Sequence, residues 1–172
     1  MIPRIKNILY ATDLSKNSAY AFRYAINSAQ KHDAQIHILH VIEMLSPTAE
    51  GLLLSHVGQE KLEKLREETK ESMIQRIKNR LNEFARRELK EDPETLKRVA
   101  SITVVFGDPA AEILQKADDL NCDAVIMGTH GKGLISHAFL GSVSERVLHR
   151  IHKPVFVIPL PKGETDITLG EF

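Results

Sequence analysis

The residues with the clearest chemistry lie in a glycine-rich stretch in the last third of the chain. Gly128, Gly131 and Gly133 are followed by Gly141 and Ser142, which open an expected helix. Glycines let backbone N–H groups approach phosphate oxygens, and the start of a helix favours negative charge. The pattern therefore indicates an anion-binding loop. A surface turn in which Ser142 only caps a helix would use the same residue types.

Short apolar runs alternate with helical patterns along the chain, and they predict the elements that must position this loop. Strands are expected over Asn7–Thr12, Gln35–Ile42, Ser101–Phe106, Ala124–Met127 and Val155–Ile158. Helices are expected after the first four strands, with Ser15 and Asp108 as N-caps of two of them. These helices cover Lys16–His32, Gln59–Lys90, about Pro109–Leu120 and Ser142–Arg150.

This alternation predicts an α/β fold with a doubly wound, open five-stranded parallel sheet. The sheet is Rossmann-like, with the expected strand order 3-2-1-4-5 and helices on both faces. Ligands bind such sheets beyond the carboxyl ends of the strands, where the strand order reverses. Two loops follow strands at that edge, namely Ala11-Thr12-Asp13 and the stretch from Gly128 to Ser142.

The middle of the chain is the least informative part. The segment Met44–Val57 has no regular period, and the conformation of Met44–Lys97 as a whole stays open. Charges of both signs surround an apolar stripe over Gln59–Lys90, which predicts one amphipathic helix about 45 Å long. A break near Thr69 is the alternative.

Composition limits the classes of protein that fit. A chain of 172 residues favours one domain, expected over residues 1–160, with a mobile tail over residues 161–172. Because 23 basic residues balance 23 acidic ones, we expect no nucleic-acid partner. The single cysteine, Cys122, favours a reducing cytoplasm, and no apolar run is long enough for insertion into a membrane.

Three stretches together resemble the universal stress protein family. Gly128-x-x-Gly131 is separated by nine residues from Gly141-Ser142, as in the nucleotide-binding signature of that family. The runs Gly141–Leu148 and Lys153–Ile158 look like its characteristic ending, and Ile8–Ser15 looks like its beginning. The resemblance covers about Ile5 to Pro159 and implies the ATP-binding branch, with Mg²⁺ held largely by the phosphates.

In ATP-binding members, the residue matching Asp13 holds the nucleoside end and the residue matching Val41 meets the adenine. Asp13 could instead cap the first helix. The resemblance places Met127 and Gly128 beside the base and ribose, and the later residues of the signature around the phosphates. The full set of implied ATP-binding residues is Ala11, Thr12, Asp13, Val41, Met127, Gly128, Thr129, His130, Gly131, Gly141, Ser142 and Val143.

Other functional motifs fit less well. The chain has neither a G-x-x-x-x-G-K-[ST] loop nor a G-x-G-x-x-G run after the first strand. A receiver domain would need an acidic pair after the first strand, and a flavodoxin-like protein would share only the topology. His37 and His40 are expected on opposite faces of a strand, and His149 and His152 have no third ligand nearby, so we expect no metal site.

The sequence therefore predicts an ATP-binding stress-response or signalling module that acts as a nucleotide-dependent conformational or partner switch. Little or no intrinsic hydrolysis and no catalytic residue are expected, since only His130 and Lys132 lie beside the loop. The alternatives are a slow ATP hydrolase or nucleotidyl transferase, and a nucleotide-free dimeric interaction protein. We expect a homodimer through Val155–Ile158, the last strand, and a protein partner of unknown identity.

Overall fold

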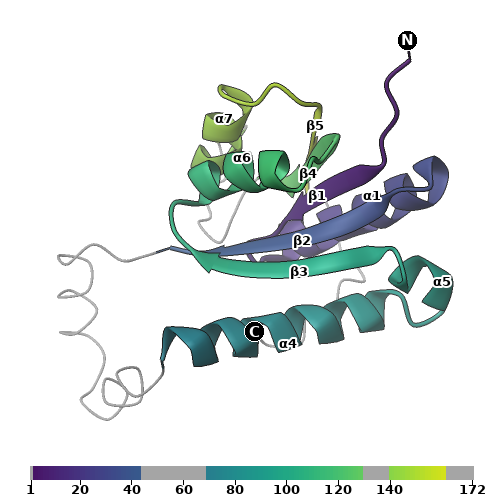
Figure 1. The fold of residues 1–172 in the computed structure, drawn as a ribbon, viewed down its shortest axis with the longest axis horizontal. Coiled ribbons are helices and arrows are strands. Elements are labelled where there is room, and N and C mark those ends of the chain that lie inside the picture. Colours follow the sequence, from purple (N-terminus) through teal and green to yellow (C-terminus); the bar gives the residue numbers. More distant parts are fainter. Residues whose placement is uncertain (1, 44–68, 130–139, 162–172) are drawn as a thin grey trace, which may run out of the picture.

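The computed structural model describes residues 2–43, 69–129 and 140–161, which contain one five-stranded sheet (Figure 1). All pairings are parallel and the strand order is β3-β2-β1-β4-β5, so the predicted fold class is confirmed. The strands are β1 (Asn7–Ala11), β2 (Gln35–Ile42), β3 (Val99–Phe106), β4 (Ala124–Gly128) and β5 (Val155–Ile158). The predicted tail lies outside the described residues, except at its first position.

Helices cover both faces of the sheet, as predicted. The helices α1 (Lys16–His32) and α4 (Lys70–Glu88) lie on one face, and α6 (Pro109–Asp119) and α7 (Ser142–Leu148) lie on the other (Figure 1). A short helix that the sequence did not predict, α5 (Pro93–Leu96), begins after Asp92, whose side chain accepts a hydrogen bond from the Thr95 N–H at 2.9 Å. No helix among the described residues is both long and apolar enough to cross a membrane.

The conformation of Thr69 distinguishes one continuous helix over Gln59–Lys90 from a helix broken near Thr69. Its backbone is extended, with φ −70° and ψ 157°, and its hydroxyl accepts a hydrogen bond from the Ser72 N–H at 3.1 Å. Because a helix cannot run through an extended residue that caps the next turn, the prediction of one uninterrupted helix is wrong. The break near Thr69 is confirmed, and residues 59–68 lie outside the described residues.

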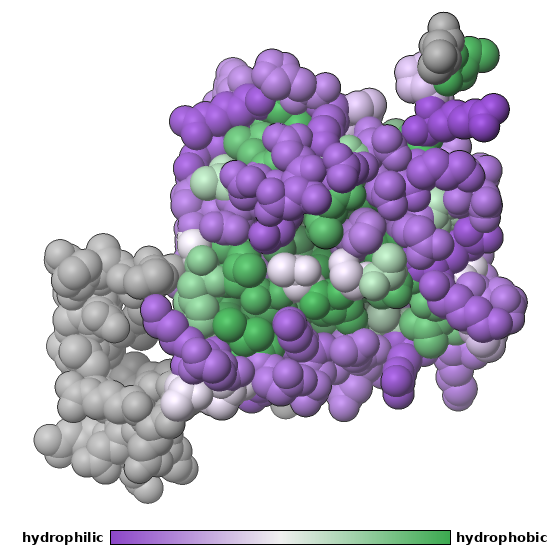
Figure 2. All heavy atoms as spheres, viewed as in Figure 1, coloured by the Kyte–Doolittle hydropathy of each residue, from purple (hydrophilic) through white to green (hydrophobic). Residues whose placement is uncertain are grey.

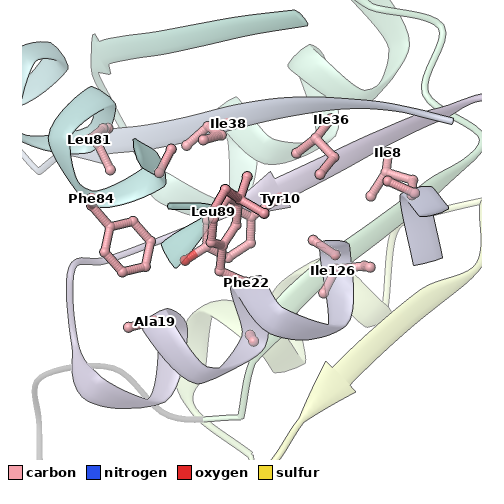
Figure 3. Close-up of a cluster of buried hydrophobic side chains, with 14 of the residues drawn as sticks. Ile8, Tyr10, Ala19, Phe22, Ile36, Ile38, Leu81, Phe84, Leu89 and Ile126 are labelled. Atoms are coloured by element: carbon pink, nitrogen blue, oxygen red, sulfur yellow. The ribbon is translucent and has the colours of Figure 1, made fainter. Parts of the chain in front are cut away.

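Apolar side chains form a separate core on each face of the sheet. Tyr10, Phe22 and Phe84 pack in series between β1, α1 and α4, with ring centroids 5.0 and 5.2 Å apart (Figure 3). On the other face, residues such as Leu9 and Val125 pack against α6 and α7. The sheet thus holds α1 and α4 rigidly on one side, and α6 and α7 on the other.

The two edge strands differ in length and in cover. The strand β3 has eight residues, of which only Val104 is buried, and Figure 2 shows apolar residues exposed between α6 and α4 on that side. The strand β3 begins two residues before the predicted Ser101, because Val99 pairs with Ile36 beyond a register irregularity. The strand β5 has four residues and forms the opposite edge, as the expected order requires.

Candidate functional site

A cavity of about 810 Å³ lies at the carboxyl ends of β1, β2 and β4, where the strand order reverses. Its walls come from segments that are far apart in the sequence, including the starts of α6 and α7 and the middle of α4. The predicted site residues among its lining are Ala11, Thr12, Asp13, Val41, Met127, Gly128, Gly141, Ser142 and Val143. The structure therefore gathers these positions around one space.

Three predicted residues remain, and of these the structure describes only Thr129, which is not among the residues that line the cavity. The Thr129 hydroxyl accepts a hydrogen bond from Asn17 Nδ2 at 3.1 Å, and its carbonyl accepts one from the Gly141 N–H at 2.6 Å. His130 and Gly131 lie outside the described residues, as does Lys132.

Asp13 uses one carboxylate oxygen within the protein and leaves the other unused. Its Oδ1 accepts a hydrogen bond from the Ser15 N–H at 3.1 Å, whereas Oδ2 is buried and has no hydrogen-bond partner in the described structure. Ser15 caps α1 by accepting from the Ser18 N–H at 3.2 Å, so the alternative that Asp13 caps this helix is wrong. A buried acceptor without a donor costs about 1–3 kcal/mol, which a hydroxyl donor on a ligand would offset.

The loop that carries Asp13 is held in an unusual conformation. Leu14 has φ 65°, a left-handed value that costs a non-glycine residue about 1–2 kcal/mol. The Thr12 hydroxyl accepts a hydrogen bond from the Leu14 N–H at 3.1 Å and lies 2.9 Å from the Ser18 hydroxyl. His40 Nδ1 lies 2.8 Å from the Thr12 carbonyl, and since a carbonyl only accepts, Nδ1 carries the proton. These bonds fix the position of Asp13.

Tyr10 anchors the same loop from inside the core. Its hydroxyl donates to the Ser18 carbonyl at 2.7 Å, and burial raises the pKa of Tyr10 above its ordinary value. The phenol is therefore a neutral hydrogen-bond donor at every physiological pH and does not act as an acid in the site.

Two glycines of the signature lie among the described residues, and they have different structural roles. A Cβ on Gly128 would lie 2.9 Å from Asn17 Nδ2 and 3.0 Å from Asn17 Cγ, so a larger residue here would force the Asn17 side chain to shift. Gly141 has an ordinary extended backbone, with φ −72° and ψ 156°, and it is the N-cap of α7. Ser142 is the first helical residue and not the cap, and anion binding by this loop stays a prediction.

Two contacts fix the start of α7 beside the cavity. The Ser144 hydroxyl donates to the Gly128 carbonyl at 3.0 Å, which joins α7 to the end of β4. The Arg146 guanidinium donates to both Asp108 carboxylate oxygens at 2.8 and 2.7 Å. Asp108 also accepts from the Ala111 N–H at 2.9 Å, which confirms it as the N-cap of α6. The first N–H groups of α7 have no acceptor within the helix.

Several lining residues were not predicted from the sequence. Leu14, His40 and Glu43 lie within two residues of predicted positions at the ends of β1 and β2. Their nearness in the sequence to those positions could have identified them. Arg76 and Arg80 come from α4, and nothing in their local sequence separates them from the other charged residues of that helix.

Titratable groups elsewhere do not form a second centre in the described structure. Burial raises the pKa of the Cys122 thiol to about 11, which keeps it protonated and unreactive. Burial lowers the pKa of His37, whose Nδ1 lies 2.8 Å from the Ser101 hydroxyl. Within the described ranges, no three His, Cys, Asp or Glu side chains are grouped so that they could hold a metal ion.

Comparisons with known proteins agree with the geometry. The family model described as "Universal stress protein family" matches residues 4–159. Universal stress protein MJ0577 of Methanocaldococcus jannaschii is 32% identical over 157 residues, which cover 89% of this chain and 94% of that protein. Universal stress protein MJ0531 of the same organism is 34% identical over 159 residues, which cover 92% of this chain and 85% of that one.

Solved structures show the same fold. The structure of MJ0577 has a TM-score of 0.60 and 29% identity, and the match covers 94% of this chain and all of that one. A universal stress protein solved in complex with cAMP has a TM-score of 0.51 and 18% identity, and the match covers 91% of this chain and 98% of that one.

Proposed function

Because this chain belongs to the universal stress protein family, we propose that it binds ATP in the cavity at the carboxyl edge of the sheet. The bound nucleotide would bias the conformation or the partner choice of a stress-response or signalling module. The observation that carries the proposal is the convergence of nine implied ATP-binding residues on one cavity of about 810 Å³. Cavities of about 300–1,000 Å³ are typical for ligands of this size.

The chemistry of the lining suits each part of an adenine nucleotide. The buried Oδ2 of Asp13 lacks a donor, which a ribose hydroxyl would supply. Val41 and Met127 offer apolar surface to the base, and the N–H groups at the start of α7 suit phosphate oxygens. Mg²⁺, where present, would be coordinated largely by the phosphates. Since one protein of this fold was solved with cAMP, an adenine nucleotide is the natural first ligand to test.

The decisive measurement identifies the ligand and then removes one contact. Mass spectrometry of small molecules released on denaturation should detect an adenine nucleotide, and calorimetry should show tighter binding of ATP than of GTP. The variant Asp13→Ala should bind ATP about 10 to 100 times more weakly, because a hydrogen bond to a charged group contributes about 1.5–3 kcal/mol. Asp118→Ala, an exposed acid paired with Lys153 at 2.9 Å, is the matched control. A wild-type protein that fails to bind ATP would contradict the proposal and favour a nucleotide-free interaction protein.

Measuring ATP hydrolysis distinguishes a nucleotide-binding module from an ATP hydrolase. Tight binding of substrate alone lowers no barrier, and phosphoryl transfer needs a placed water and added charge in line. We therefore expect intact ATP to persist for minutes in a single-turnover assay with the protein in excess. Turnover on the order of 1 s⁻¹ that disappears in both Asp13→Ala and Gly141→Val would overturn the module in favour of an ATP hydrolase.

A further inference from the structure

The helix α4 contributes charge to the cavity from the face of the sheet opposite α7. Arg76, Ile77 and Arg80 all line the cavity, and Figure 1 shows that α4 begins at the edge where β2 and β3 end. Arg76 and Arg80 are four residues apart and therefore lie on the same side of the helix, one turn from each other. Among the described lining residues, they are the only lysine or arginine side chains.

The position of these two arginines is set by the packing of their helix. Ile77 lies between them and is 8% exposed, and the following turns insert Leu81 and Phe84 into the core. At the far end of α4, the Glu88 carboxylate lies 3.2 Å from Arg23 of α1. Because α4 is held along its length, it cannot slide or rotate without breaking these contacts. The packing of α4 thus fixes the backbone positions from which both arginines reach the cavity.

The glycine signature supplies no positive side chain to a phosphate, whereas α4 supplies two. Ser142 and Val143 open α7 with backbone N–H groups and one hydroxyl, and none of Gly128, Gly131, Gly141, Ser142 and Val143 has a cationic side chain. The lining also holds the carboxylates Asp13 and Glu43, which repel a phosphate. His130 and Lys132 of the same loop lie outside the described residues, so within the described lining the positive charge that suits several phosphates comes from α4. The guanidinium is the side chain best suited to phosphate, since it binds two oxygens at once and keeps its charge at every relevant pH.

We propose that Arg76 and Arg80 form a cationic wall that recognises the phosphate charge of the nucleotide and makes the cavity select ATP over ADP, AMP and adenosine. The inference rests on the proposed ATP-binding function and adds to it two specificity-determining residues from outside the glycine signature. Both arginines already have an interaction partner within the protein. A guanidinium has five N–H donors, so it can keep such a contact and still bind a phosphate oxygen.

Calorimetry with a series of ligands tests this recognition. ATP, ADP, AMP and adenosine are titrated into the wild type and into Arg76→Gln/Arg80→Gln, in EDTA so that Mg²⁺ does not neutralise the phosphates. We expect the double variant to lose at least tenfold in affinity for ATP, less for ADP and AMP, and no more than twofold for adenosine. Its affinity for ATP should also depend less on salt, since fewer charges are paired on binding.

A second pair of arginines on the same helix provides the control. Arg86→Gln/Arg87→Gln removes the same charge from exposed positions of α4 that do not line the cavity. It should bind all four ligands like the wild type. Equal losses in both double variants would show an effect of overall charge and overturn the inference. An equal loss for ATP and adenosine in Arg76→Gln/Arg80→Gln would also overturn it, because that result indicates a structural role.

A conservative double variant separates loss of phosphate recognition from loss of folding. Arg76→Lys/Arg80→Lys retains both charges and good helix formers, but it loses the planar two-donor geometry. It should recover part of the ATP affinity lost in the glutamine variant, with an unchanged unfolding midpoint. No loss of ATP affinity in the glutamine variant would overturn this inference while the ATP-binding function stands. Failure of the wild type to bind ATP would overturn the function itself, so the two failures are distinguishable.

Discussion

Asp13 and Gly128 illustrate how single residues shape the cavity in different ways. The Asp13 side chain contributes an acceptor that the protein itself uses only in part. Gly128 matters because it has no side chain, since Asn17 occupies the space where a Cβ would lie. The packing of β4 against α1 therefore favours glycine at this position, whether or not a nucleotide is bound.

The close approach at Gly128 predicts a loss of stability on substitution. Gly128→Ala should lower the free energy of unfolding by about 1–3 kcal/mol, since an added methyl group in a packed site forces its neighbours to shift. Urea denaturation measures this difference. Asn17→Ala in the same chain makes room for the new methyl group, so the double variant should lose less stability than the two single variants together. An unchanged midpoint for Gly128→Ala would contradict the packing role.

At the scale of elements, the ion pair between Asp108 and Arg146 joins the start of α6 to α7. Both helices line the cavity with their first residues, so the pair holds two walls together. The Arg146 guanidinium, and after it the Ala111 N–H, lower the pKa of Asp108 below its ordinary value. Because both side chains are more than two-fifths exposed, solvent screens the pair and its stabilisation is small.

This pair predicts a pH dependence with a definite sign. A carboxyl whose pKa is lowered on folding stabilises the protein above its unfolded pKa of about 3.9, and the stabilisation is lost as the pH falls through the folded pKa. Asp108→Asn keeps a good helix cap but removes the charge, so it should be less stable than the wild type at pH 6. The difference should shrink between about pH 4 and pH 2, as followed by thermal unfolding.

The comparison between the two chains isolates Asp108 from other acids. Asp33, Asp92 and Asp119 also have lowered pKa values, and they affect the wild type and the variant alike. A second variant, Arg146→Gln, should show the same loss, and the double variant should lose little more. A difference between the wild type and Asp108→Asn that stays constant with pH would contradict the assignment.

At the scale of the whole molecule, the open edges of the sheet determine where another chain can add. The strand β5 is an edge strand, and Phe156 and Leu160 are exposed beside it at 42% and 40%. Large exposed apolar side chains next to unpaired backbone groups favour association. We propose that two copies pair antiparallel through Val155–Ile158, with the twofold symmetry usual for homodimers.

Substitution of the exposed aromatic tests this assembly. Phe156→Glu should shift the protein from dimer to monomer at micromolar concentration, as measured by sedimentation velocity, because a carboxylate is costly to bury between two strands. Val157 is a less suitable target, since it packs against the core on the α6 face. Ile2→Glu, at a position 89% exposed, is the control and should leave the dimer intact. A wild type that sediments as a monomer would contradict the proposal.

The sequence by itself determined the features that depend on near neighbours. Apolar runs and caps such as Ser15 and Asp108 act over a few residues, so their spacing predicted most of the described elements and the edge of the sheet that holds the cavity. Two local features were not settled in this way, the helix start at Thr69 and the short helix α5 after Asp92. The family resemblance supplied the candidate residues, and their adjacency followed from the predicted fold.

Only the tertiary structure decided which side chains meet across large distances in the chain. Asn17 contacts Gly128, and Arg76 and Arg80 line the same cavity as Asp13. These residues are more than 60 positions apart, and no period or motif in one segment encodes the other. Such contacts depend on how helices dock on the sheet, which the packing of the whole core sets. The same packing left Asp13 Oδ2 buried without a donor, a property that no residue type can reveal before its surroundings are known.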